Sequence, residues 1–347
     1  MVSASKRARL GFTLLEVLTV LSILGILLAI LLPAIQSARE SARRIQCVTQ
    51  MRQVGIGLIS YEALHHFFPS VNSPSAATRD GHIISTRYHS PLARMLPLLD
   101  LSSIYDTGNF SLPPTASDAL SSNLTAMKVS VGLFVCPSDP SRIVLGYGRA
   151  NYRFDIGPTP WFSPFQEAPD SWSGPFSAHV FYRAADFADG LSQTVGVSER
   201  IQGDWSKEIV SRGDYGLTKI FSFTMPPLGG PDWAISACSD TSLLSDYESR
   251  SGESWFLSGH HFTSYNHCAT PNSRNNDCSF DPLSGSLNSR VLHSGVFSAR
   301  SYHPGGVNTL FMDGCVRFTS DTVNVAVWRA VGTRSGGETI SNAALEY

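Results

Sequence analysis

Residues 6–35 read KRARLGFTLLEVLTVLSILGILLAILLPAI, and this stretch decides the architecture. Residues 17–32 carry no charge, and the apolar run extends back to Phe12 with Glu16 as its one interruption. A helix that rises 1.5 Å per residue needs about 20 such residues to cross the hydrocarbon of a bilayer. We therefore predict a transmembrane helix over 12–32.

Two simpler interpretations of this stretch explain less of it. A secretory signal also has a basic start and an apolar middle, but no A-x-A cleavage site follows the run at Pro33, Ala34 and Ile35. A plain N-terminal anchor does not account for Glu16, because a carboxylate at that depth costs a few kcal/mol unless it is paired. The secretory signal and the plain anchor therefore explain this stretch less well than a membrane span in which Glu16 has a partner.

Residues 6–16, KRARLGFTLLE, resemble the N-terminus of type IV prepilins and of the pseudopilins of type II secretion. In that family a prepilin peptidase/methyltransferase cuts after the glycine, here Gly11, and methylates the new N-terminus, here Phe12. The resemblance implies a leader over 1–11 that is removed, and a mature helix that keeps its span. It also implies that Glu16 pairs with the α-ammonium of Phe12 on a neighbouring pilin-like subunit in a filament.

The orientation in the membrane follows from the motif and not from charge counting. Basic residues precede the span, and four more follow it, at Arg39, Arg43, Arg44 and Arg52, so the positive-inside rule is ambiguous. The prepilin resemblance implies a single-pass protein in contact with inner-membrane lipids, with its first eleven residues cytoplasmic. Its head would be periplasmic or at the cell surface.

The helix is expected to continue beyond the membrane as an amphipathic segment over 33–68. Apolar or small residues recur there at steps of three or four: Ile35, Ala38, Ala42, Ile45, Val48, Met51, Val54 and Leu58. Pro33 should kink the helix, which we expect to end near His66, before Phe68 and Pro69. A straight helix from Phe12 would be about 80 Å long.

The remaining residues, 69–347, have the composition of a β-rich globular head. The whole chain of 347 residues has 26 basic and 28 acidic side chains, with 16% charged residues, 28 Gly and 20 Pro. The near-zero balance lacks the basic footprint of a nucleic-acid binder. Strands are expected at 129–135, 192–199 and 220–224. We predict an α+β fold in which the long transmembrane and amphipathic helix packs on a β-rich, pilin-like head.

Residues 155–177 are rich in Pro, Gly and aromatic side chains. We interpret them as an ordered surface loop packed by its own aromatics, with an aromatic carbohydrate-binding shelf as the alternative. The aromatic residues concerned are Trp161, Phe162, Phe165 and Trp172.

The C-terminal stretch 302–319, YHPGGVNTLFMDGCVRFT, predicts a hairpin. Asp313-Gly314 between two alternating runs favours a two-residue type I′ turn, because both central positions need positive φ. This register pairs Phe311 with Val316 and Thr309 with Phe318. A short helix should follow, with Ser320 or Asp321 as its N-cap and Gly332 as its stop.

The spacing of His303, nine residues, Asp313 and Gly314 resembles the H-x9-DG signature of a bacterial domain of unknown function that follows prepilin-type leaders and carries a solute-binding-like label. The resemblance departs in detail at Met51-Arg52-Gln53 but covers nearly the whole chain. Further stretches that agree with that family are 47–69, 133–140, 151–157, 187–194, 199–200, 265–273 and 328–338. It implies architecture more firmly than activity.

The sequence contains only weak signals for metal-binding or catalytic residues. For His303 and Asp313 we favour structural roles in a loop and a turn. His260, His261, His267 and Cys268 lack the paired short spacings of zinc sites. Calcium is conceivable on Asp186, Asp189 or Asp313, but no D-x-D-x-D-G loop is present. We therefore predict no cofactor.

Six cysteines, at 47, 136, 238, 268, 278 and 315, lie in a region assigned to the outside of the membrane, so they are potential disulfides. Among fifteen possible connectivities we predict Cys268 with Cys278, because the loop between them is polar and otherwise poorly anchored. The other four stay unassigned.

These features predict a pilin-like or pseudopilin-like structural protein and not an enzyme. The alternative is a membrane-tethered solute- or glycan-binding protein that uses the prepilin leader only for its anchor. A tethered hydrolase is a third possibility, but the sequence shows no G-x-S-x-G elbow, phosphate loop or H-E-x-x-H motif.

Overall fold

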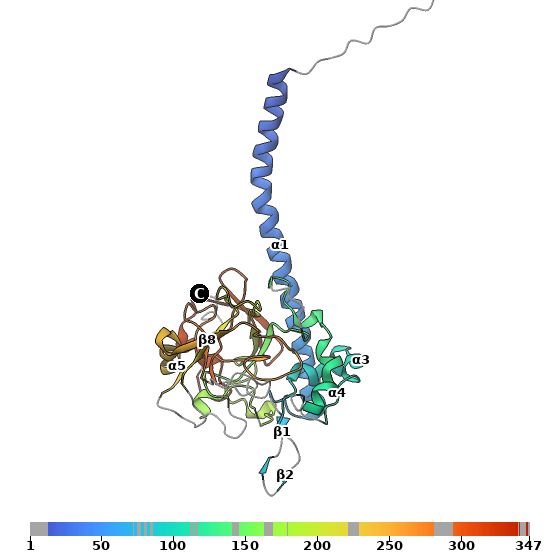
Figure 1. The fold of residues 1–347 in the computed structure, drawn as a ribbon, viewed down its shortest axis with the longest axis vertical. Coiled ribbons are helices and arrows are strands. Elements are labelled where there is room, and N and C mark those ends of the chain that lie inside the picture. The colour runs from blue at the N-terminus through green and yellow to red at the C-terminus, as the bar shows by residue number, and fades with distance from the viewer. Residues whose placement is uncertain are drawn as a thin grey trace, which may run out of the picture.

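A long helix rises from a rounded head in the computed structural model of this chain (Figure 1). The structure describes residues 13–71, 73–74, 78–79, 82–83, 86–111, 114, 117–140, 146–162, 169–178, 180–220, 229–280, 294–338, 340 and 345. This architecture, a long N-terminal helix on a head with mixed β-sheets, confirms the predicted α+β fold.

The helix α1 (Leu14–His65) is 52 residues long and runs through Pro33 without interruption. It begins with a capping box, in which Thr13 and Glu16 each bond the other's backbone N–H. It ends at His66, whose φ of 64° is left-handed and whose N–H donates to the carbonyl of Glu62. The predicted end of the helix near His66 is confirmed.

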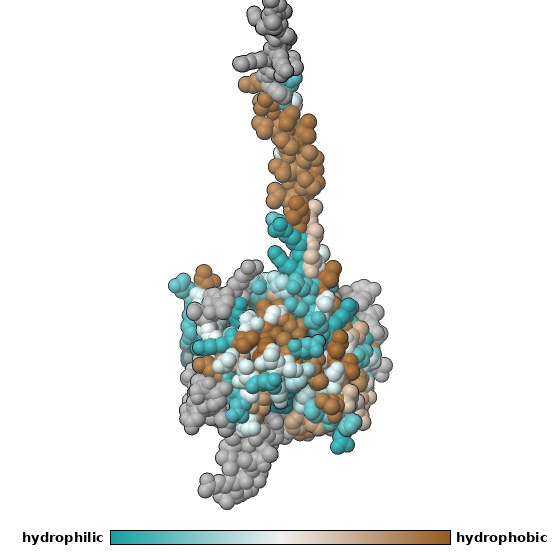
Figure 2. Space-filling model, turned by 90° about the vertical axis from the view of Figure 1, so that its right-hand side faces the viewer, coloured by the Kyte–Doolittle hydropathy of each residue, from teal (hydrophilic) through white to brown (hydrophobic). Residues whose placement is uncertain are grey.

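The first half of α1 makes an apolar column outside the head. The side chains of Leu14, Leu24 and Ile30 are 82%, 48% and 66% exposed. Figure 2 shows this column as continuous hydrophobic surface, followed by a hydrophilic band where the helix meets the head. By length and composition α1 can cross a membrane.

The second half of α1 packs into the head through residues that recur at helical spacing. Met51, Val54 and Leu58 are buried there. Gly55 permits the closest approach, since a Cβ at this position would lie 2.8 Å from Leu310 Cδ1. The apolar face expected after Pro33 is therefore buried only in its C-terminal part, because Ile35 and Ile45 remain 49% and 68% exposed.

The main sheet has five strands in the order β13-β12-β6-β5-β9. Its strands β12 (Gly306–Phe311), β13 (Val316–Ser320), β6 (Val195–Glu199) and β5 (Tyr152–Asp155) pair antiparallel, and β9 (Ser264–Tyr265) is parallel to β5. The helix α1 contacts β12 and β13. Tyr152 of β5 donates its hydroxyl to Gln50 Oε1 of α1 at 2.8 Å. The sheet therefore positions the helix.

A second sheet has four strands in the order β11-β10-β7-β8. They are β11 (Gly295–Val296), β10 (Cys278–Ser279), β7 (Tyr215–Thr218) and β8 (Leu244–Glu248). Only the β7 and β10 pair is parallel among them.

Short elements complete the head. The hairpin-like pairs are β1 (Ser73–Pro74) with β4 (Thr86–Arg87) and β2 (Thr78–Arg79) with β3 (His82–Ile83). The α-helices are α2 (Pro91–Met95), α3 (Ser102–Tyr105), α4 (Ser117–Lys128), α5 (Pro231–Ser239) and α7 (Val325–Val331). The 3-10 helices are η1 (Leu96–Leu99), η2 (Gly132–Phe134), η3 (Asp170–Trp172), η4 (Ala184–Asp186) and η5 (Thr241–Leu243).

The strand predictions are confirmed in part. The strand expected at 192–199 is β6, but the strand expected at 129–135 is wrong, because this segment contains η2. Apolar residues in a short run cannot distinguish a strand from a buried helical turn. Most of the strand expected at 220–224 lies outside the described residues.

The C-terminal hairpin is present, but its predicted turn is wrong. Of Asp313 and Gly314 only the glycine has positive φ, at 86°. Phe311 accepts from the Gly314 N–H and donates to the Cys315 carbonyl, both at 2.9 Å. This is a three-residue loop with a glycine bulge, which shifts the register by one residue. The observed pairs are Leu310 with Val316, Thr309 with Arg317 and Asn308 with Phe318.

The helix after the hairpin is α7, and its predicted N-cap is also wrong. Asn324 is the N-cap, since its side chain accepts from the N–H of Ala326 at 2.8 Å. Ser320 instead accepts from the N–H of Thr322 and closes the turn after β13. The predicted stop at Gly332 is confirmed.

Candidate functional site

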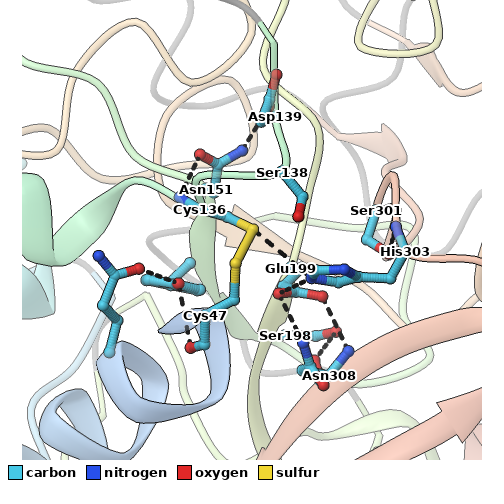
Figure 3. Close-up of polar contacts among 12 residues, drawn as sticks. Cys47, Cys136, Ser138, Asp139, Asn151, Ser198, Glu199, Ser301, His303 and Asn308 are labelled. Atoms are coloured by element: carbon cyan, nitrogen blue, oxygen red, sulfur yellow. Dashed lines mark hydrogen bonds and ion pairs between the residues drawn. A yellow bond between two sulfur atoms is a disulfide. The ribbon is translucent and has the colours of Figure 1, made fainter. Parts of the chain in front are cut away.

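Four segments that lie far apart in the sequence meet where α1 enters the head (Figure 3). The ring of His303 lies at the centre. Its Nδ1 is 3.0 Å from Glu40 Oε1 of α1, and its Nε2 is 3.2 Å from Glu199 Oε1 at the end of β6. Cys136 Sγ lies 3.6 Å from the same Nε2. The histidine of the H-x9-DG signature therefore joins the long helix to the main sheet.

A disulfide lies beside this histidine and links α1 to the head through Cys47 and Cys136. The backbone N–H of Cys136 donates to Asn151 Oδ1 at 3.0 Å, which holds the loop that carries this cysteine. The hydroxyl oxygen of Tyr152, the next residue, lies 3.2 Å from the carbonyl oxygen of Cys47. Covalent and hydrogen bonds thus fix the same turn of α1.

The predicted disulfide between Cys268 and Cys278 is wrong. Cys278 is bonded to Cys238 of α5, and Cys268 is a buried free thiol. Burial raises the pKa of the Cys268 thiol. The prediction relied on a short polar loop, whereas helix α5 and strand β10 bring the actual partners together across 40 residues of sequence. Cys315 is a second free cysteine and is exposed.

One buried carboxylate, Glu199, and one partly exposed carboxylate, Glu40, flank His303. Glu199 is 2% exposed, and its Oε2 accepts from the backbone N–H of Asn308 at 2.9 Å while its Oε1 accepts from Asn308 Nδ2 at 3.0 Å. Burial of His303 opposes its charge, but Glu199 and Glu40 outweigh that effect and raise the pKa of His303. The two carboxylates therefore favour the protonated form of the imidazole that lies between them.

Glu40 completes this arrangement from the helix side. Desolvation opposes its charge, but hydrogen bonds from Ser138 at 2.8 Å and from His303 lower the pKa of Glu40. Ser138 belongs to the same turn as Cys136, so one turn of the head contacts α1 through both a hydroxyl and a sulfur atom.

The other half of the H-x9-DG signature touches α1 at a second point. Asp313 Oδ1 accepts from the N–H of Cys315 at 2.9 Å and so stabilises the hairpin turn. A Cβ at Gly314 would lie 2.7 Å from Ile59 Cδ1 of α1. Asp313 lies in the turn, where we expected it, whereas the ring of His303, which we expected to bond a loop, bonds Glu40 of α1 and Glu199 of β6.

The histidines considered for zinc lie in separate environments. His260 is stacked on Phe297, with ring centroids 4.5 Å apart. His261 lies between the Tyr215 hydroxyl and Glu253, at 2.6 and 3.1 Å. His267 bonds the carbonyl of Trp328 at 2.7 Å, and burial lowers the pKa of this imidazole to about 3.

The aspartates considered for calcium each accept hydrogen bonds from backbone N–H groups. Asp186 accepts from the N–H of Arg183 at 2.7 Å. Asp189 accepts from the N–H groups of Gly336 and Gly337, both at 2.8 Å. With Asp313 in its turn, the structure does not gather these three carboxylates around one point.

The aromatic segment over 155–177 packs inward where it is described. Trp161 and Phe162 are buried, and Trp172 packs against Gly230. These contacts favour the interpretation as a packed loop over an exposed sugar-binding shelf. Phe165 lies outside the described residues.

The processing residues lie at the far end of the stalk. Gly11 and Phe12 fall outside the described residues. Glu16 lies in the first turn of α1, where its Oε2 accepts from the Thr13 N–H at 2.8 Å. Cleavage after Gly11 stays a prediction.

An N-terminal methylation motif followed directly by the apolar helix α1 is the feature that suggests a pilin- or pseudopilin-like protein. Residues 6–32 match the model described as the prokaryotic N-terminal methylation motif, and residues 36–326 match the model described as protein of unknown function (DUF1559). The second match covers most of the chain, so the chain belongs to the DUF1559 family. Searches of curated proteins and of solved structures each found no match.

Sequence reasoning missed most of the central site. It singled out His303 but left Cys47 and Cys136 unpaired and gave Glu40 and Glu199 no role. Their separation along the chain gives no local pattern. A signal was nevertheless present, because Cys47, Cys136, Glu199 and His303 each lie in a stretch that agrees with the family.

Proposed function

We propose that this protein is a pilin-like structural subunit, cleaved after Gly11 by prepilin peptidase and methylated at Phe12. Residues 12–32 would anchor it in the inner membrane, with the head on the periplasmic side or at the cell surface. The observation that carries the proposal is the apolar half of α1, which stands clear of the head directly after the methylation motif.

The exposed half of α1 suits packing in lipid and, equally, packing among other subunits in a filament. Among the residues that the structure describes, the Glu16 carboxylate accepts hydrogen bonds from the N–H and the hydroxyl of Thr13, both at 2.8 Å. Removal of residues 1–11 would free the amine of Phe12 on each subunit. A neighbouring amine could then pair with Glu16 and set the register between subunits.

The head would act by holding α1 and presenting its surface to partners, without an enzymatic step. Its buried histidines support this role. His260, His261 and His267 are each fully buried, and His303 is 3% exposed and bound between carboxylates. A general base must reach a substrate proton, and these rings face protein groups.

The test is the N-terminus of the protein isolated from native membranes, determined by mass spectrometry. A mature chain that begins at methylated Phe12 is the expected result. Glu16→Ala should then be processed and inserted but fail to enter filaments, whereas Ser22→Ala, on the same exposed helix, should assemble normally. An intact Met1 would contradict the proposal, as would cleavage beyond Ala34.

A polar cavity favours the alternative of a tethered solute-binding protein. It has a volume of about 380 Å³ and is lined in part by Arg212, Asp214, Tyr247 and Asn272. Burial raises the pKa of Asp214 to about 6. A rise in melting temperature with a small polar solute or sugar, abolished by Tyr247→Ala, would support this alternative. An unchanged melting temperature across such compounds would count against it.

A further inference from the structure

The disulfide at the junction of α1 and the head lies among further metal-binding groups. Cys47 Sγ, Cys136 Sγ, a carboxylate oxygen of Glu199 and a ring nitrogen of His303 all lie within 4.8 Å of one another, and all four residues are buried. Two thiolates, an imidazole and a carboxylate are ligands that zinc accepts. With the two sulfur atoms reduced, the site would therefore offer four ligand atoms.

Two distances from His303 Nε2 already match the spacing in a tetrahedral zinc shell. Zinc bonds of about 2.3 Å to sulfur and about 2.0 Å to nitrogen or oxygen place sulfur and nitrogen about 3.5 Å apart, and nitrogen and oxygen about 3.3 Å apart. His303 Nε2 lies 3.6 Å from Cys136 Sγ and 3.2 Å from Glu199 Oε1. The two sulfur atoms must separate to about 3.8 Å, and the remaining pairs of ligand atoms start within 4.8 Å of one another.

The surrounding hydrogen bonds are those that orient metal ligands. Glu40 Oε1 lies 3.0 Å from His303 Nδ1, so Nε2 is the nitrogen turned toward the sulfur atoms. A histidine that binds a metal through one nitrogen usually donates the other to a carboxylate or carbonyl. Asn308 holds the Glu199 carboxylate from its backbone and its side chain. The ligands are thus preoriented from both α1 and β12.

We propose that Cys47, Cys136, Glu199 and His303 bind one Zn²⁺ ion when the two cysteines are thiols. The disulfide and the metal ion then exclude each other, and either one ties α1 to the head. The site is distinct from the processing motif and from the polar cavity. It is available to the chain before the cysteines are oxidised, and again after reduction.

A phosphine reductant converts the disulfide into the zinc-binding form. The phosphine supplies two electrons to the Cys47–Cys136 bond and becomes its oxide by taking the oxygen of one water, whose two protons produce two thiols. Zn²⁺ then displaces both thiol protons and the proton on His303 Nε2, which pass to the buffer. Return to the disulfide requires release of the ion and a two-electron thiol oxidant.

The second disulfide provides a matched control within the same chain. Cys238 and Cys278 lie in an apolar cluster with Trp161, Phe280 and Val296. The free thiol of Cys268 lies in the same cluster, but among the described residues no histidine or carboxylate forms a metal-sized group with this pair. Zinc bound after reduction should therefore depend on one cysteine pair and not on the other.

The experiment uses the full-length chain in detergent, with and without phosphine, and measures bound zinc after removal of free ion. The reduced wild type and Cys238→Ser/Cys278→Ser should each hold about one ion per chain, and the oxidised wild type and Cys47→Ser/Cys136→Ser none. Co²⁺ in the reduced chain should produce a tetrahedral spectrum with thiolate charge transfer. Glu40→Gln should weaken zinc binding about 10- to 100-fold while the stoichiometry stays unchanged.

Equal zinc in the reduced wild type and in Cys47→Ser/Cys136→Ser would overturn the proposal. Full zinc affinity in His303→Ala would do the same. Near-ultraviolet circular dichroism reports whether the reduced chain keeps its tertiary structure. A reduced chain that loses this signal even with excess zinc also contradicts the proposal, because the ion is expected to replace the disulfide as the tie between α1 and the head.

Discussion

Removal of the Cys47–Cys136 disulfide should be the costliest cysteine change in this protein. The two cysteines are separated by 89 residues, and they join the long helix to the head. In the chain-entropy model, closing a loop of about 90 residues stabilises the folded state by about 4.6 kcal/mol at 25 °C. We expect Cys47→Ala/Cys136→Ala to lose a free energy of unfolding of about this size in oxidising buffer.

The matched control is Cys238→Ala/Cys278→Ala, which opens a loop with a sequence separation of 40. The same model assigns that bond about 3.9 kcal/mol, so the first variant should be less stable than the second by about 0.7 kcal/mol. Both can be measured on the full-length chain in detergent by urea unfolding. The buried Trp255 and Trp328 report on the head through fluorescence.

Two results would refute this reasoning. One is a decrease of less than about 1 kcal/mol in the free energy of unfolding of Cys47→Ala/Cys136→Ala, in a case where alkylation and mass spectrometry show the disulfide intact in the wild type. Loop closure would then contribute little to stability. The other is a peptide map that links Cys268 to Cys278, because helix α5 could not then lie against β10 as the structure has it.

Three further changes test other parts of the head. His303→Gln should remove a stabilisation that is fully present below about pH 6.5 and is lost as the pH rises through the raised pKa of His303 in the folded protein. The unfolding free energies of wild type and variant should therefore differ more at pH 6 than at pH 9, and an equal difference at both would contradict the paired imidazolium. Asp277→Asn removes the carboxylate between two arginines of the core and should cost about 3 kcal/mol in urea unfolding, whereas a loss below about 1 kcal/mol would show that these guanidiniums find other partners. Gly148→Ala should lower the free energy of unfolding by about 2 kcal/mol, because the new Cβ would overlap the carbonyl oxygen of Val129. The Cβ of Gly132→Ala would meet no atom within 4 Å, so this control should change stability little, and equal losses would refute the steric argument.

Local patterns predicted those parts of the fold whose causes lie close together in the sequence. The helix α1 followed from an uncharged run and from apolar residues at steps of three and four, and its end followed from Phe68 and Pro69. The C-terminal hairpin followed from Asp313 and Gly314, but its register did not. A one-residue bulge at Gly314 changes the turn type at small local cost, and packing against Ile59 of α1 selects among such turns.

The candidate site could not be predicted from local patterns, because its residues come from distant parts of the sequence. His303 was recognisable from its spacing to Asp313, yet its partners come from positions 40, 47, 136 and 199, and no local period relates them. Disulfide pairing was misjudged for the same reason, since the short loop between Cys268 and Cys278 is no guide to which side chains meet across a sheet.

Hydrophobicity, turn residues and the prepilin-like motif were sufficient for the long helix, its exposed span and the class of head, because each depends on neighbours within a few residues. The tertiary structure alone decided that Glu40 and Cys47 of α1 face His303, Glu199 and Cys136. The physical reason is that burial of the apolar face of α1 against the main sheet sets which polar side chains lie opposite one another. Most of these polar groups are buried and need a charged, hydrogen-bonded or covalent partner, whereas Glu40 keeps 27% of its side chain exposed.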